Sequence, residues 1–162
     1  MIFDIHAATY YRVECYSSTG ILKWVEEFPN LVTTEGKNTL LDYTLKTGQA
    51  SPVWYVGLKN TGSAAAADTM ASHALWTENT TYSDATRRTF TPGAISAGSV
   101  DNSASKAQFN INGTTTIYGA FLTSNSTKGG TTGLLYGVGD FATSRAVVSG
   151  DVLNVQITAT IT

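Results

Sequence analysis

The chain has 162 residues, of which 42% are hydrophobic and 14% are charged, and its formal net charge is −2. This length suits one domain, 1–162, and the ten Lys and Arg residues are scattered, so they form no basic stripe for nucleic-acid binding. A single cysteine excludes an intrachain disulfide and a cysteine metal cluster. The sequence has neither a signal-peptide pattern at its start nor an apolar run near the ~18 residues of a membrane span. We therefore expect no membrane partner and synthesis in a reducing cytoplasm.

The charged fraction lies well below the ~25% that is typical of soluble domains, while Thr and Ser make up about a quarter of the chain. Threonine is β-branched and favours strands, and it tolerates water without a long flexible side chain. A surface with so little net charge does little to keep copies apart, so self-association is expected.

The first expected element is an N-terminal hairpin over residues 1–28. Tyr11, Val13 and Cys15 alternate with polar residues, which predicts a strand with Cys15 as a small core residue. A Ser-Ser-Thr-Gly turn ending at Gly20 leads into a second strand, which Pro29 is expected to end because proline cannot donate to a ladder. This hairpin is also a candidate for attachment or strand exchange.

One short helix is expected at about residues 35–46. Thr33 or Thr34 can cap its start, and Glu35 is favourably placed in the first turn. Leu41 and Leu45 fall four residues apart on one face and Leu40 lies beside them, which predicts that this side of the helix packs on a sheet.

Further strands are expected over 53–58, 89–91, 107–111, 116–122, 134–136, 146–148 and 153–161. Asn112-Gly113 is the strongest two-residue hairpin signal in the chain, so we expect the strands on either side of it to pair. In 153–161, Leu153, Val155 and Ile157 alternate with polar residues, as in a half-buried strand. The pattern of about eight short strands and one helix predicts a mainly β, single-domain antiparallel β-sandwich of jelly-roll type.

A long loop is expected at about residues 60–88, and loops of this length in a compact domain are usually functional or disordered. Its aromatic residues argue against disorder. The loop and the strand before it hold residue types that are enriched at interface hot spots. The candidate interface residues are Trp54, Tyr55, His73, Trp76, Tyr82, Arg87 and Arg88. An alternative interpretation makes the tryptophans core anchors and has Tyr82 and Arg87 tie the loop down.

Catalytic patterns are not evident in the sequence. No G-x-S-x-G motif accompanies the two histidines, His6 and His73. Asp68, His73 and Glu78 lie five residues apart, a spacing that fits neither one helix face nor one strand face. We therefore favour a loop whose polar groups bond to its own backbone over a metal site, and we expect no enzyme activity, no metal and no cofactor.

One set of segments includes the aromatic strand and the loop and extends over most of the chain from about residue 24. These segments are 54–58 (WYVGL), 68–73 (DTMASH), 76–78 (WTE), 82–83 (YS), 86–87 (TR), 30–32 (NLV) with Gly36 and 40–41 (LL), 107–109 (AQF), 117–122 (IYGAFL) and 150–153 (GDVL). Together they resemble a family of small virion proteins of tailed bacteriophages.

Members of this family look like capsid decoration (cement) proteins, or are taken for tail-associated or fibre proteins, and no active site is known for the family. The resemblance therefore implies a structural protein on the capsid exterior, made in the cytoplasm of the host bacterium. Its expected partners are the major capsid protein and further copies of itself, as a trimer or dimer. The alternative is a tail or tail-fibre component that contacts host surface glycans.

Overall fold

The structure, a computed structural model, describes residues 6–162. Strands account for 48% of the chain and helical residues for 10%, so the fold is mainly β, as predicted. The strands are β1 Ala7–Tyr16, β2 Leu22–Val32, β3 Tyr55–Lys59, β4 Glu78–Asn79, β5 Arg88–Thr89, β6 Ser99–Asp101, β7 Ala107–Asn110, β8 Thr115–Thr123, β9 Leu135–Val147 and β10 Val152–Ile161, and the helices are α1 Thr34–Leu45 and the 3₁₀ turn η1 Ser103–Ser105.

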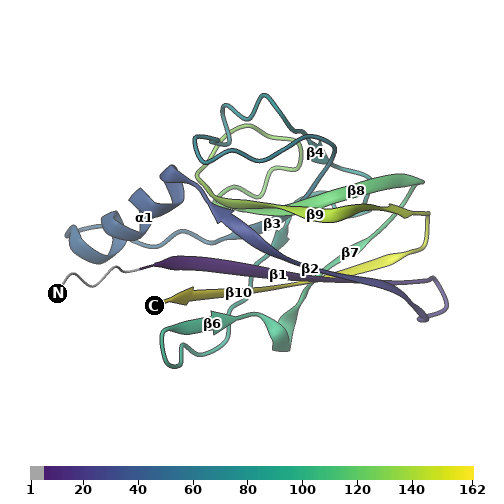
Figure 1. Ribbon diagram of the computed structural model, residues 1–162, viewed down its shortest axis with the longest axis horizontal. Coiled ribbons are helices and arrows are strands. Elements are labelled where there is room, and N and C mark those ends of the chain that lie inside the picture. Colours follow the sequence, from purple (N-terminus) through teal and green to yellow (C-terminus); the bar gives the residue numbers. More distant parts are fainter. Residues whose placement is uncertain (1–5) are drawn as a thin grey trace.

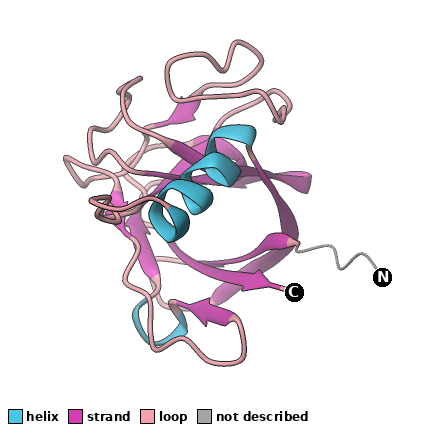
Figure 2. Cartoon of the chain, turned by 90° about the vertical axis from the view of Figure 1, so that its left-hand side faces the viewer, coloured by secondary structure: helices cyan, strands magenta, loops and turns pink. Residues whose placement is uncertain are grey.

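The antiparallel strands follow one path, β4-β3-β8-β9-β2-β1-β10-β6, with β5 beside β3 and β7 beside β10. The sheet curls on itself into a half-barrel, and α1 lies across one open end (Figures 1 and 2).

Strand β2 joins the two halves of the sheet. It pairs with β1 from Leu22 to Asn30, and its last two residues, Leu31 and Val32, pair with β9. The apolar faces of both halves meet in one main core, where alternating residues of β1 and β10 are fully buried, as the sequence pattern predicts. Cys15 is among them. The jelly-roll sandwich predicted from the sequence is not confirmed by this strand order, and the observed architecture is the curled antiparallel sheet.

The N-terminal hairpin is present as β1 and β2, although residues 1–5 of the predicted range lie outside the described part. Pro29 was expected to end the second strand, and this expectation is wrong because β2 continues to Val32. The outer edge of β2 gains a partner only at Leu31, where pairing with β9 begins. Pro29 lies before this β2–β9 ladder, so its missing N–H leaves none of the bonds of that ladder unmade.

The predicted pairing across Asn112-Gly113 is also wrong. β7, before the turn, pairs with β10, whereas β8, after it, pairs with β3 and β9. Neither Asn112 nor Gly113 has the positive φ that a tight type I′ hairpin requires. The turn instead carries the chain from one half of the sheet to the other.

The helix is confirmed to within one residue, with Thr33 as its N-cap accepting from the N–H of Gly36. The predicted face is wrong, because Leu41 and Leu45 are exposed while Gly36 and Thr39 are buried. A Cβ at Gly36 would lie 2.0 Å from the carbonyl oxygen of Tyr136, so glycine is required for this close approach. The helix is therefore attached to β9 by its first turn, and Leu40 is the leucine of α1 that packs against the main core.

Among residues 6–162, no helix is long and apolar enough to cross a membrane.

Candidate functional site

The loop over 60–88 is attached to the sheet at several points along its length. It leaves β3, returns as β4, and reaches β5, and both short strands pair with β3. Between β3 and β4 the loop folds back on itself, with the N–H of Asn60 donating to the carbonyl of Thr77 at 2.8 Å. Figure 1 shows this segment with the 124–134 loop at the top of the half-barrel, away from β6 and β10.

Arg87 anchors the C-terminal part of the loop from the interior. Its side chain has no exposed surface, and it forms a bidentate ion pair with Glu78 through Nε at 3.1 Å and Nη2 at 2.8 Å. The guanidinium also donates to the carbonyls of Asn125 and Gly130, at 2.9 and 2.7 Å. It lies 5.3 Å from the ring centre of Phe121. A planar guanidinium with several fixed donors suits this role, because it joins three segments at once.

Trp76 anchors the middle of the loop. It is 2% exposed and packs against Phe121, with the two ring centres 5.2 Å apart, in a small second core beneath the loop. Its Nε1 donates to Asp68 at 2.9 Å, which satisfies the indole N–H. His73 stacks on the outer face of the indole at 4.0 Å, and its Nδ1 lies 2.9 Å from the carbonyl oxygen of Trp76.

Lys59 anchors the start of the loop. Its side chain is fully buried, and Nζ lies 2.8 Å from a carboxylate oxygen of Asp140 on β9. The same ammonium donates to the carbonyls of Asn60 and Gly62. Gly62 has φ +102°, and a Cβ there would lie 1.6 Å from the carbonyl oxygen of Leu75. Only glycine therefore permits this turn.

Tyr82 is fully buried and packs edge-on against Phe109, with ring centres 5.0 Å apart. Nζ of Lys128 lies over its ring at 4.4 Å and donates to the carbonyls of Tyr82 and Asp84. Burial, and then the neighbouring Glu78, raises the pKa of Tyr82, so its hydroxyl stays protonated.

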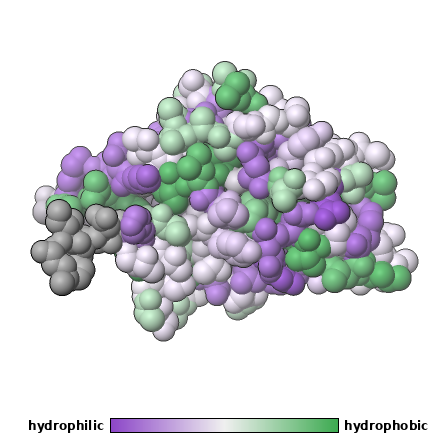
Figure 3. All heavy atoms as spheres, in the orientation of Figure 1, coloured by the Kyte–Doolittle hydropathy of each residue, from purple (hydrophilic) through white to green (hydrophobic). Residues whose placement is uncertain are grey.

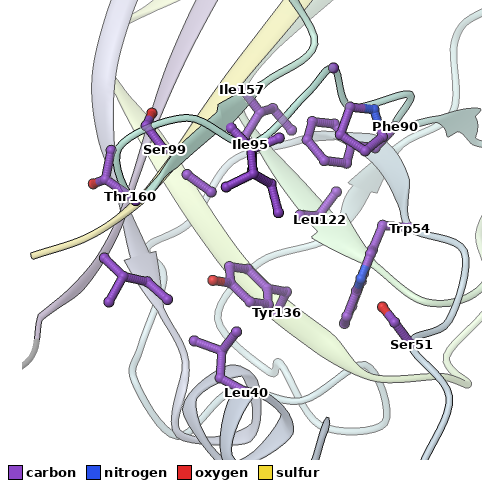
Figure 4. Close-up of a pocket in the computed structure, with 16 residues that line it drawn as sticks. Leu40, Ser51, Trp54, Phe90, Ile95, Ser99, Leu122, Tyr136, Ile157 and Thr160 are labelled. Carbon is purple, nitrogen blue, oxygen red and sulfur yellow. The ribbon is translucent and has the colours of Figure 1, made fainter. Parts of the chain in front are cut away.

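The seven candidate interface residues therefore divide into three groups. Trp76, Tyr82 and Arg87 lie in the interior, as the alternative interpretation held, and they tie the loop down. Tyr55, His73 and Arg88 are half-buried, and Arg88 pairs with Asp84 at 2.6 Å. Trp54 is half-buried against Tyr136 and lines a groove beside α1 rather than the loop (Figure 4).

The exposed side chains of the loop carry no charge. All five charged residues of the loop are buried or half-buried, and each has a contact described above. What remains exposed is small and neutral apart from Leu75, which is 65% exposed. We call these residues the loop surface: Thr61, Ser63, Ala66, Ala67, Ala71, Ser72, Ala74, Leu75, Thr77, Thr80, Ser83, Ala85 and Thr86. Pale shades accordingly dominate the top of the molecule in Figure 3.

Asp68, His73 and Glu78 are not brought together as metal ligands. Asp68 binds the Trp76 indole, and Glu78 binds Arg87. In the part of the chain that the structure describes, no three His, Cys, Asp or Glu side chains form a group that could hold a metal ion.

The sequence reasoning missed the roles of Lys59, Lys128 and Asp140. A lysine in an apolar strand, as in 55–59, is a weak signal for a buried ion pair, but its partner lies 81 residues away and no local spacing indicates it.

The exposed side chains of this region form an uncharged surface that buried anchors attach to a mainly β scaffold. Comparisons with protein-family models, with curated proteins and with solved structures found no match.

Proposed function

We propose that this chain is a non-enzymatic structural protein of a tailed-bacteriophage virion. In this role it binds the outside of the capsid and stabilises contacts between major capsid subunits, as a decoration or cement protein. The observation that carries the proposal is the loop surface, which is uncharged and is held in place by buried anchors. The resemblance of the loop segments to phage virion proteins supports the same role.

Such a surface is well suited to protein binding for two physical reasons. Ala, Ser and Thr lose little side-chain entropy when they are covered, and neutral side chains cost less to remove from water than charged ones do. The anchors Lys59, Trp76 and Arg87 already fix the backbone, so little ordering remains to be done on binding.

A decorating domain acts by bridging. When it contacts two neighbouring shell subunits, opening the shell must also break the contacts of the bridge, so the closed shell is stabilised by mass action. A stable contact of this kind needs about 800 Å² on each partner. The proposal includes assembly as a homo-oligomer, a trimer or dimer. It also includes assignment of the curled sheet to the jelly-roll type.

The test is to locate and count the protein in purified virions. Hundreds of copies on the capsid exterior are expected from quantitative mass spectrometry and electron microscopy. A few dozen copies or fewer, at the tail, would instead favour the tail or fibre alternative. The partly exposed ring of Trp54 supports contact with a glycan in that alternative. Trp76 and Tyr82 do not support it, because they are too deeply buried to meet a glycan.

A matched pair of variants tests the loop surface itself. Leu75→Asp places a charge on the loop surface, and Ile21→Asp places one on the β1–β2 turn, where the exposure is nearly the same, 65% against 68%. When purified protein is added back to undecorated capsids, Leu75→Asp is expected to lose binding and Ile21→Asp to retain it. Equal binding by both variants would refute the assignment of the loop surface.

A further inference from the structure

The Asn112-Gly113 turn lies between the two halves of the sheet and belongs to neither of them. β7 ends at Asn110, and β8 begins at Thr115. Asn112 is exposed. Among the described residues, its amide side chain has no hydrogen-bond partner, and neither has the backbone N–H of Gly113. The turn therefore places an unbonded side-chain amide next to an unbonded backbone nitrogen.

The chain that leads into this turn is held in place. The N–H of Ile111 donates to the carbonyl of Asp151, and the N–H of Gly150 donates to the carbonyl of Ile111, both at 2.8 Å. Movement within the turn breaks neither of these bonds, because they lie before Asn112. Local rotation at Asn112 and Gly113 is therefore possible while the rest of the fold stays intact.

Asn112 differs in two respects from the other asparagines of the chain. It is the only one that a glycine follows. Its side chain is also unbonded, whereas Nδ2 of Asn79 donates to Asn60 and Thr115, both at 2.8 Å, in a site where Asn79 is 1% exposed. Asn102 is equally buried, and its side chain binds the backbone of β10. The fold holds these amides in fixed positions and leaves the amide of Asn112 without such a restraint.

We propose that Asn112 is a site of spontaneous deamidation. The backbone nitrogen of Gly113 loses its proton to water and attacks Cγ of Asn112. A bond forms between these two atoms, the bond from Cγ to Nδ2 breaks, and ammonia leaves with a proton taken from water, so a five-membered succinimide ring is formed. Water then adds to one of the two ring carbonyls and opens the ring, which gives an aspartate or an isoaspartate. Water is the only co-reactant.

Glycine at position 113 favours this attack for a steric reason. It has no Cβ to crowd the attacking nitrogen. The φ of Gly113 is not positive, so alanine fits the backbone at this position. The added Cβ would lie 2.9 Å from Cγ2 of Thr81, a methyl group of a half-buried side chain that can move aside. Gly113→Ala is therefore a matched variant that keeps the turn and hinders the attack.

The new charge would lie beside the loop surface. The N–H of Ser83 donates to the carbonyl of Asn110 at 2.9 Å, and Gly113 lies next to Thr81, so 110–113 run beside 81–83 of the loop. Either product carries a carboxylate in place of the amide and adds one negative charge to the formal net charge of −2. Covering a charge costs more than covering a neutral group, so binding through the loop surface should weaken. This consequence rests on the proposed function, whereas the modification itself does not.

Peptide mapping by mass spectrometry tests the modification. Native protein and urea-unfolded protein are kept in mildly alkaline buffer for several days, and the loss of amide from each asparagine is measured. In the native protein, Asn112 is expected to lose its amide severalfold faster than any other asparagine, and Gly113→Ala is expected to slow this loss severalfold. A thermal melt equal to that of the wild-type chain confirms that the variant is folded.

Two results would overturn the proposal. If Asn112 keeps its amide in the native protein but loses it in the unfolded chain, the fold holds the turn in an unreactive geometry. If it keeps its amide in both samples, the Asn112-Gly113 pair is not reactive at all.

Binding to undecorated capsids tests the consequence for the loop surface. Fresh wild-type protein and aged Gly113→Ala are expected to bind equally, and aged wild-type protein severalfold more weakly. Equal binding by fresh and deamidated wild-type protein would refute the effect on the loop surface. Failure of the fresh protein to bind would refute the proposed function instead, and the peptide map would still decide the modification.

Discussion

The buried ion pair between Glu78 and Arg87 leads to a quantitative prediction for Glu78→Gln. The substitution keeps the size of the side chain but leaves the guanidinium without a counter-charge, and the Arg87 side chain has no exposed surface. Breaking a buried pair by removing one partner costs about 3–5 kcal/mol. Arg87 keeps the carbonyls of Asn125 and Gly130 as acceptors, so we expect the lower end, a loss of about 3 kcal/mol. For a chain of this size the melting temperature should fall by roughly 6–12 °C.

Urea unfolding followed by tryptophan fluorescence measures this change, with two comparisons built in. Asp42→Asn removes the exposed pair with Lys46 and should cost at most about 0.5 kcal/mol. The double variant Glu78→Gln with Arg87→Met removes the buried charge altogether and should recover part of the loss. If Glu78→Gln costs no more than Asp42→Asn, the claim that this pair anchors the loop is refuted.

Three further predictions concern acid stability, thiol reactivity and helix attachment. The hydrogen bond from Arg12 lowers the pKa of Glu14 in the folded state. The Glu14 carboxylate therefore stabilises the fold above its unfolded pKa of about 4.3, and this stabilisation is lost as the pH falls through the lower folded pKa. Glu14→Gln should be less stable than wild type at neutral pH and equally stable at about pH 2. Burial, and then the Asp151 charge, raises the pKa of Cys15 to about 11, so native protein should resist Ellman's reagent at pH 8 and react only as fast as it unfolds. Gly36→Ala should destabilise the fold by about 2 kcal/mol or more although alanine favours helices, because its Cβ meets the Tyr136 carbonyl, and thermal melts measure this loss.

Each of these predictions has a result that contradicts it. A constant difference between Glu14→Gln and wild type down to pH 2 would show that the carboxylate charge does not contribute. Stoichiometric labelling of Cys15 within minutes under native conditions would show an accessible thiolate. For the helix, Asn38→Ala is the control, since Asn38 is exposed and its replacement by alanine raises helix propensity without a new contact. If Gly36→Ala is as stable as this control, the close approach of Gly36 to the Tyr136 carbonyl does not require glycine.

The elements that the sequence predicted best are those with a strong local signal. Alternation over residues 153–161 identified β10, and the Thr33 cap with Glu35 placed the helix to within one residue. Both signals depend on neighbours in sequence, where period and capping chemistry act directly. Pairing of distant strands is a different matter. The Asn112-Gly113 turn has the composition of a hairpin, yet each flanking strand pairs with a strand more than 30 residues away and not with the other flank.

The candidate site shows the same division. The sequence identified the loop and most of its aromatic anchors, because a long segment rich in Trp and Tyr must pack on something. It did not show which of them face inward, since that depends on Phe121, Asn125 and Gly130 from elsewhere in the chain. The groove beside α1 was missed because Leu41 and Leu45, which line it, follow the spacing of a buried helix face, although the helix is held by Gly36 instead.

The pairing of β1 with β10 has a consequence for synthesis on the ribosome. β1 is complete at Tyr16, but its partner begins only at Val152. At about 5–20 residues per second, roughly 7–27 s pass before β10 emerges, and during that time β1 has only β2 beside it. One edge of the nascent hairpin stays open to other chains in this interval. The charges of Arg12, Glu14 and Glu27 on that hairpin are therefore placed where they oppose premature association between nascent copies.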